Sequence, residues 1–135
     1  MSNSQPTQRT AVILNSSTDW DEWLEIVKTK AIGGEIWSFV DPAIEKDKLP
    51  TLKQPDVPIA ATVNSDKTKI SELSEDEREE LKLLRFTYKH RLTQYECQKT
   101  LLASLRSFIQ ETVSRTNLLY TFKQDTPYDM LIALK

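Results

Sequence analysis

The sequence predicts an all-α protein, a small helical bundle with one long central helix and a proline-rich extended loop. The stretch from Ser74 to about Thr116 contains no glycine and no proline, and its apolar residues recur at steps of three and four, as on one face of a helix. Residues 18–32 and 126–134 show the same spacing behind capping residues. Before the long helix, prolines interrupt the chain so often that neither a helix nor an interior strand fits: Pro42, Pro50, Pro55 and Pro58.

Length and composition narrow the classes of protein that are compatible with the chain. The 135 residues suit one domain, and 18 basic against 20 acidic residues do not suggest a general polyanion binder. Because no stretch is apolar enough to span a membrane and no signal peptide is recognisable, we expect a soluble, cytoplasmic protein without a membrane partner. The single Cys97 excludes an internal disulfide, and two adjacent glycines argue against nucleotide-binding loops. No cofactor is expected.

The N-terminal part begins with a polar segment, and residues 1–17 are predicted to form a flexible tail. Its apolar run at residues 11–14 either docks on the body or pairs with another copy. A helical domain is expected over residues 18–135. Thr18 or Asp19 is the predicted N-cap of its first helix, and Gly33-Gly34 are predicted to end that helix because glycine takes the left-handed conformation that many helix ends require.

Residues 36–40 predict a second, brief helix that Asp41-Pro42 closes. Residues 41–73 predict an extended, proline-rich loop, in which residues 60–63 could form one turn. The loop leads directly to the long helix.

The start of the long helix carries a capping box, Ser74 followed by Glu77, and an acidic run that suits the positive end of a helix dipole. The pattern continues to about Arg115, as one helix or as two nearly collinear helices. Its second half is apolar over a wider arc, which predicts deeper burial there. After a connection, Thr126-Pro127 with Asp129 three residues after the cap predicts the start of the last helix.

The sequence offers no catalytic, cofactor-binding or metal-binding constellation. His90 is the only histidine and lies between Lys89 and Arg91 on a face expected to be solvated, so we interpret it as an ordinary surface residue rather than a general base. Cys97 has no neighbouring histidine or second cysteine, and a half-buried structural thiol is favoured over a nucleophile. We therefore expect no enzyme and no small-molecule substrate.

Three tryptophans are candidates for an assembly site. Trp20 and Trp23 are three residues apart on the first helix and Trp37 lies on the next segment, so the three rings could meet in one cluster. The simpler interpretation is that they form the core of the N-terminal half. The alternative is that an exposed ring anchors an assembly contact.

A stripe of four cations is the candidate RNA contact: Arg78, Lys82, Arg85 and Lys89. From Lys82 to Arg106 there are six basic residues against one acidic residue, Glu96, and phosphates would be attracted by this local excess. A solvated helix flank is the favoured interpretation, because we expect no aromatic residue to interleave with these cations and stack bases, and the acidic run lies immediately before them.

The apolar stripe of the long helix could also form a coiled-coil dimer interface. Gln98 and Lys99 interrupt the stripe, and no complementary charges flank it clearly. Packing within the chain is therefore favoured over packing between chains.

The order of these features resembles a known family. Trp20-x-x-Trp23, Ile36-Trp37, Asp41-Pro42, the proline-spaced loop, the long helix and the final segment 127–135 together resemble the N-terminal Gag segment of copia-type LTR retrotransposon polyproteins, especially fungal ones. The resemblance covers roughly residue 18 to the end.

This resemblance implies an all-helical domain like the N-terminal domain of a capsid, which associates with itself into a virus-like particle around the element's RNA. Family members continue with a second helical half and often a zinc knuckle, so the natural protein is expected to extend beyond Lys135. The implied partners are other copies of the chain and, weakly through this segment, RNA. Two alternatives stay open: an RNA-binding helical domain that uses the cation stripe, and a domesticated Gag-derived coiled-coil adaptor for a host partner.

Overall fold

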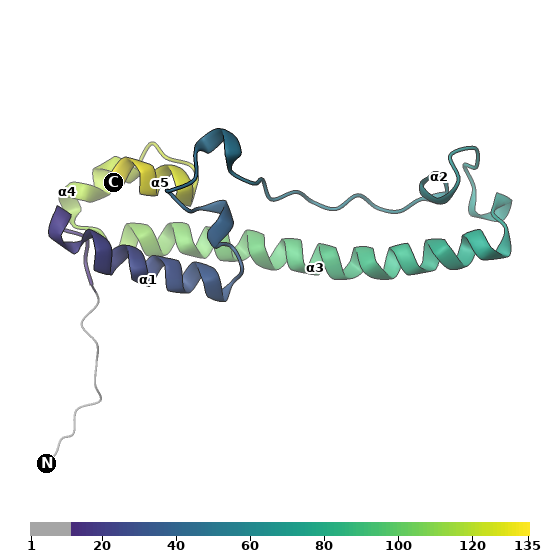
Figure 1. Cartoon of the computed structure of the whole chain (residues 1–135), viewed down its shortest axis with the longest axis horizontal. Coiled ribbons are helices and arrows are strands. Elements are labelled where there is room, and N and C mark those ends of the chain that lie inside the picture. The colour runs from purple at the N-terminus through teal and green to yellow at the C-terminus, as the bar shows by residue number, and fades with distance from the viewer. Residues whose placement is uncertain (1–11) are drawn as a thin grey trace, which may run out of the picture. The chain divides into compact units, whose positions relative to one another are not determined.

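The computed structural model describes residues 12–135, and the all-α prediction is confirmed for them. Five α-helices and five 3-10 turns follow one another in this part of the chain, and its only strand-like pairing is an isolated bridge between Leu14 and Val113. The central helix α3, Glu75–Glu111, is one continuous helix rather than two collinear ones (Figure 1).

The chain divides into two compact units, where its length had suggested one domain. The first unit comprises the chain up to Pro50 together with Thr100–Lys135, and the second comprises Thr51–Lys99. α3 therefore contributes residues to both. The physical reason for the division is that each unit has its own cluster of buried apolar side chains.

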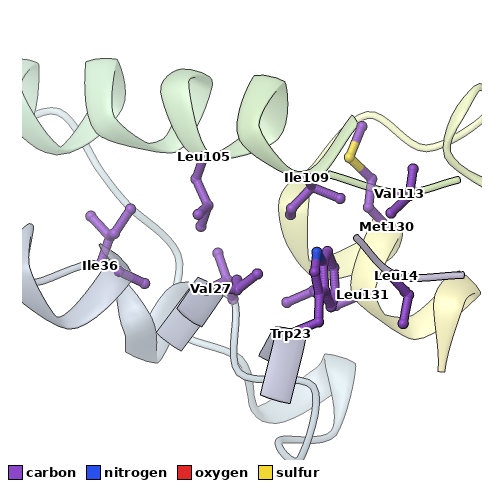
Figure 2. Close-up of a cluster of buried hydrophobic side chains, with 11 residues drawn as sticks. Leu14, Trp23, Val27, Ile36, Leu105, Ile109, Val113, Met130 and Leu131 are labelled. Atoms are coloured by element: carbon purple, nitrogen blue, oxygen red, sulfur yellow. The ribbon is translucent and has the colours of Figure 1, made fainter. Parts of the chain in front are cut away.

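The first unit packs four helical segments around one core. Helix α1, Trp20–Gly33, lies along the C-terminal part of α3, and α4, Arg115–Leu118, and α5, Pro127–Leu134, complete the unit (Figure 1). Four 3-10 turns connect or extend these helices: η1 Ser17–Asp19, η2 Trp37–Phe39, η3 Lys46–Lys48 and η5 Leu119–Thr121. Figure 2 shows the core side chains converging from these elements; they are Leu14, Trp23, Val27, Ala31, Ile36, Val40, Leu105, Ile109, Val113, Met130 and Leu131.

The second unit has a much smaller core. Its buried side chains are Ala60, Leu73 and Leu81, with Val63 packed against them. The segment predicted as an extended loop does run extended over residues 49–59, and it then forms the short helix α2, Ala60–Val63, and the turn η4, Ile70–Glu72. The deeper burial predicted for the second half of α3 is confirmed, because Leu105 and Ile109 belong to the larger core.

Two helix starts are confirmed at the residues that the sequence indicates. The Ser74 N–H donates to Glu77 Oε1 at 2.9 Å and the Glu77 N–H donates to Ser74 Oγ at 3.2 Å, which is the reciprocal capping box of α3. At α5 the Asp129 N–H donates to Thr126 Oγ1 at 3.1 Å, and Pro127 occupies the first turn. Both caps satisfy backbone donors that the helix itself leaves free.

The predicted start of the first helix is confirmed, because α1 begins at Trp20 and Asp19 is its N-cap. The Asp19 carboxylate accepts the N–H groups of Ser16 at 3.0 Å and Asn15 at 3.1 Å, so a 3-10 turn precedes α1. These backbone N–H groups, Ser16 first, lower the pKa of Asp19 below its ordinary value because they stabilise the ionised form.

The end of the long helix was predicted four residues too late. α3 ends at Glu111, because Leu14 pairs with the chain that follows: the Leu14 N–H donates to Thr112 O at 2.8 Å, and the Ser114 N–H donates to Leu14 O at 2.9 Å. Leu14 is buried in the larger core. Of the predicted tail, residues 1–11 lie outside the described residues, and the apolar run docks on the body at Leu14.

The two glycines end the first helix as predicted, but not through the left-handed conformation that was expected of them. α1 ends at Gly33, but the left-handed residue beyond it is Glu35, with φ 58°, and neither glycine has a positive φ. Gly34 lies close to Leu101 of α3 instead: a Cβ at this position would lie 2.6 Å from Leu101 Cδ1, so the leucine side chain would have to shift.

Candidate functional site

The three tryptophans belong to the first unit, but the structure pairs only two of them as rings. Trp20 and Trp23 have ring centroids 5.7 Å apart, tilted by 38°. Trp23 is completely buried, and its Nε1–H donates to Thr112 Oγ1 at 2.9 Å. Trp37 is half-buried against the same core, with the Lys28 ammonium 5.9 Å from its ring centroid. Trp23 thus acts as a core residue, and Trp20 and Trp37 cover the edge of that core.

The four cations of the candidate RNA stripe all lie on the exposed side of α3 within the second unit. Three of them have local partners. Arg78 Nη2 donates to Ser71 O at 3.2 Å, Arg85 Nε donates to Pro58 O at 3.4 Å, and Lys82 Nζ forms an exposed ion pair with Glu79 Oε1 at 3.3 Å. The two arginines therefore fasten the preceding segments to the helix, while the two lysines extend from it.

An exposed aromatic ring lies among these cations, contrary to the expectation that none does. Phe86 is 63 % exposed, and its ring contacts His90 edge-to-face at a centroid distance of 4.8 Å. The sequence prediction overlooked Phe86, which lies between Arg85 and Lys89 of the stripe. The signal was available, since Phe86 falls two residues from both Leu84 and Tyr88 and so points away from that stripe.

Cys97 differs from its predicted environment too. The thiol is exposed rather than half-buried. Cys97 follows Tyr95 of the apolar stripe by two residues, which turns its side chain toward the opposite side of α3. Exposure by itself assigns no chemistry to this residue.

The first unit exposes a group of large apolar side chains, most of them in a segment that the sequence had indicated only as a connection. Leu119, Tyr120 and Phe122 are 64 %, 58 % and 59 % exposed, and Ile132 on the contacting helix α5 is 44 % exposed. We call these four residues the η5 patch. The available signal was the presence of four apolar residues in the predicted link between helices, Leu118, Leu119, Tyr120 and Phe122, since such a link is normally polar.

Searches of residues 12–135 found neither a group of three or more His, Cys, Asp or Glu side chains placed to hold a metal ion nor a helix long and apolar enough to cross a membrane. Comparisons with protein-family models, curated protein sequences and solved structures gave no match. The function has to be argued from the chain's own surfaces.

Proposed function

We propose that the chain is a structural self-association module of the Gag or capsid type, whose copies assemble into particles that enclose retrotransposon RNA. The observation that carries this proposal is the η5 patch of the first unit. Large exposed apolar patches on a protein often mark sites where another molecule binds. The resemblance to copia-type Gag segments supplies the kind of partner, another copy of the same chain.

The patch is held in place by a buried residue in its middle. Thr121 is fully buried, its Oγ1–H donates to Leu118 O at 2.7 Å, and its Oγ1 accepts from Gln110 Nε2 at 3.2 Å. Its neighbours Tyr120 and Phe122 are exposed to solvent. An apolar group on an anchored segment loses less conformational entropy when a partner covers it, which favours association.

A contact between identical patches requires that each surface complement itself. Lys123 and Asp125 follow the patch directly and carry opposite charges, so a two-fold arrangement can pair unlike charges beside the apolar centre. A particle also needs a second, different contact, because a two-fold contact on its own joins only two copies.

The test is the mass of the purified chain by light scattering on a sizing column, from low to high micromolar concentration. The wild-type mass is expected to rise with concentration, and the double variant Leu119→Ser/Phe122→Ser is expected to stay monomeric. Leu83→Ser is the matched control, because Leu83 is equally exposed, at 69 %, but lies in the second unit. A wild-type chain that is monomeric at every concentration, or a double variant that associates like the wild type, contradicts the proposal.

A further inference from the structure

We propose that the exposed side of α3 around Phe86 binds single-stranded nucleic acid, with Phe86 stacking on an unpaired base and Lys82 and Lys89 contacting the flanking phosphates. This site lies wholly in the second unit, whereas the η5 patch belongs to the first. It does not depend on self-association, since a monomer would carry it complete.

The ring of Phe86 is open to solvent. Phe86 is 63 % exposed, and an edge-to-face contact with His90 covers at most one face of either ring. At least one face of Phe86 is therefore not covered by His90. Every nucleobase has a π-face, so an open aromatic ring is a stacking platform that accepts any unpaired base.

Two lysines flank the ring along the helix. On a helix, residues three and four positions apart are neighbours, so Lys82 and Lys89 lie on either side of Phe86 along the axis, roughly 10 Å apart. Both side chains are exposed. An ammonium on each side of a stacked base is well placed to contact the backbone phosphates that flank that base.

The charge of α3 is segregated along the helix within the second unit. Residues 75–80 hold one basic and five acidic side chains, and residues 81–99 hold five basic and one acidic, which gives net charges of −4 and +4. The positive half contains Phe86. Such separation raises the local concentration of a polyanion around the ring and keeps it from the acidic start of α3.

The combination of ring and cations favours a single strand over other partners. In a duplex the faces of the bases are covered by their neighbours, so Phe86 would have nothing to stack on. An apolar protein partner would use Phe86 and the neighbouring Leu83, which is 69 % exposed, without need of the lysines. The test separates these cases.

Binding is measured by fluorescence anisotropy with labelled 12-nucleotide oligoadenylate RNA, the same sequence as DNA, and a 12-base-pair duplex. The Leu119→Ser/Phe122→Ser background is used, so that failure of the self-association proposal does not affect the result. The expected order is tighter binding of either single strand than of the duplex. Tighter binding of the RNA strand than of the DNA strand would indicate an additional contact to the 2′-hydroxyl group. Equal affinity for the two strands would indicate that only bases and phosphates are contacted.

The variants assign the contacts. Phe86→Leu, which keeps an apolar side chain without the ring, is expected to weaken binding roughly 5- to 150-fold, while Phe86→Trp retains it. Lys82→Gln/Lys89→Gln is expected to reduce the slope of log affinity against log salt by about 1.4, at about 0.7 for each phosphate that a lysine no longer neutralises. Leu83→Ala is the matched control and should bind like its parent; circular dichroism verifies the helix content of each variant.

The inference would be overturned by the absence of single-strand binding by the parent chain, by equal affinity for the duplex, or by undiminished binding of Phe86→Leu. Equal losses of affinity in Phe86→Leu and Leu83→Ala would overturn it as well, because they would indicate a general apolar contact rather than base stacking.

Discussion

Trp23 combines complete burial with a hydrogen bond that links two elements far apart in the sequence. Its indole N–H donates to Thr112 Oγ1, and the Thr112 hydroxyl in turn donates to Phe108 O at 2.8 Å. Trp23→Phe removes the donor and leaves unfilled volume in the larger core. We expect a loss of about 1–3 kcal/mol in the free energy of unfolding, measured by urea titration with circular dichroism. The half-buried Trp37 is the control, and an equal loss in Trp37→Phe would show that burial and the Thr112 bond are not what matters.

The adjacent glycines differ in what a side chain would meet. At Gly33 an added Cβ has no atom within 4 Å, whereas at Gly34 it approaches Leu101 Cδ1. Gly33→Ala is expected to stabilise the chain by about 0.5–1 kcal/mol, because alanine has less conformational freedom to lose in the unfolded state. Gly34→Ala is expected to be less stable than Gly33→Ala by about 1 kcal/mol, because Leu101 has to move. Equal thermal midpoints for the two variants would contradict this assignment.

At the scale of elements, the start of α3 depends on one carboxylate that links two segments. Glu77 accepts the Ser74 N–H and the Asn64 Nδ2–H, the latter at 2.8 Å. The N–H of Ser74, followed by the Asn64 amide, lowers the pKa of Glu77 below its ordinary value of 4.5. Because the pKa is lower in the folded state, the ionised group stabilises the fold above pH 4.5, and this contribution is lost as pH falls through the lowered value.

Glu77→Gln is therefore expected to melt at a lower temperature than the wild type at pH 7 and to show a smaller difference from it near pH 3. Thermal melting followed by circular dichroism at 222 nm measures both. Glu80→Gln is the matched control, since it removes the same charge one turn further along α3. A variant whose difference from the wild type stays constant down to pH 3 would show that the capping carboxylate is not the source.

The elements that sequence reasoning located correctly are those whose signals are local. Ser74 with Glu77 and Thr126 with Asp129 mark helix starts because each cap is formed by residues three positions apart. The end of α3 was misplaced because it depends on Leu14, almost a hundred residues earlier, and no local pattern contains that pairing. Likewise Gly34 owes its role to Leu101. Of the candidate surface, the cations were recognised from their spacing, and the exposure of Phe86 was equally a local signal, because its offset of two residues from Leu84 and Tyr88 turns it away from the apolar stripe.

At the scale of the whole molecule, the two units have cores of very different size. The larger core gathers side chains from α1, α3, α5 and the segment around Leu14, whereas the smaller one consists of Ala60, Leu73 and Leu81 with Val63. Stability follows buried apolar area, so the second unit is expected to open at a lower free energy than the first. The proposed nucleic-acid site thus lies on the less stable unit, where a bound strand would stabilise the fold by mass action.

This difference predicts that the two units respond separately to core truncation. Leu81→Ala is expected to destabilise the second unit by about 2–5 kcal/mol and so to reduce the helical signal at 222 nm. The fluorescence midpoint should shift by an amount that corresponds to less than about 0.5 kcal/mol, because all three tryptophans belong to the first unit and residues that share no partners are nearly independent. Leu105→Ala, at a residue equally buried but in the larger core, should instead shift the fluorescence midpoint. If Leu81→Ala shifts that midpoint as far as Leu105→Ala does, the two units unfold together, which contradicts the prediction.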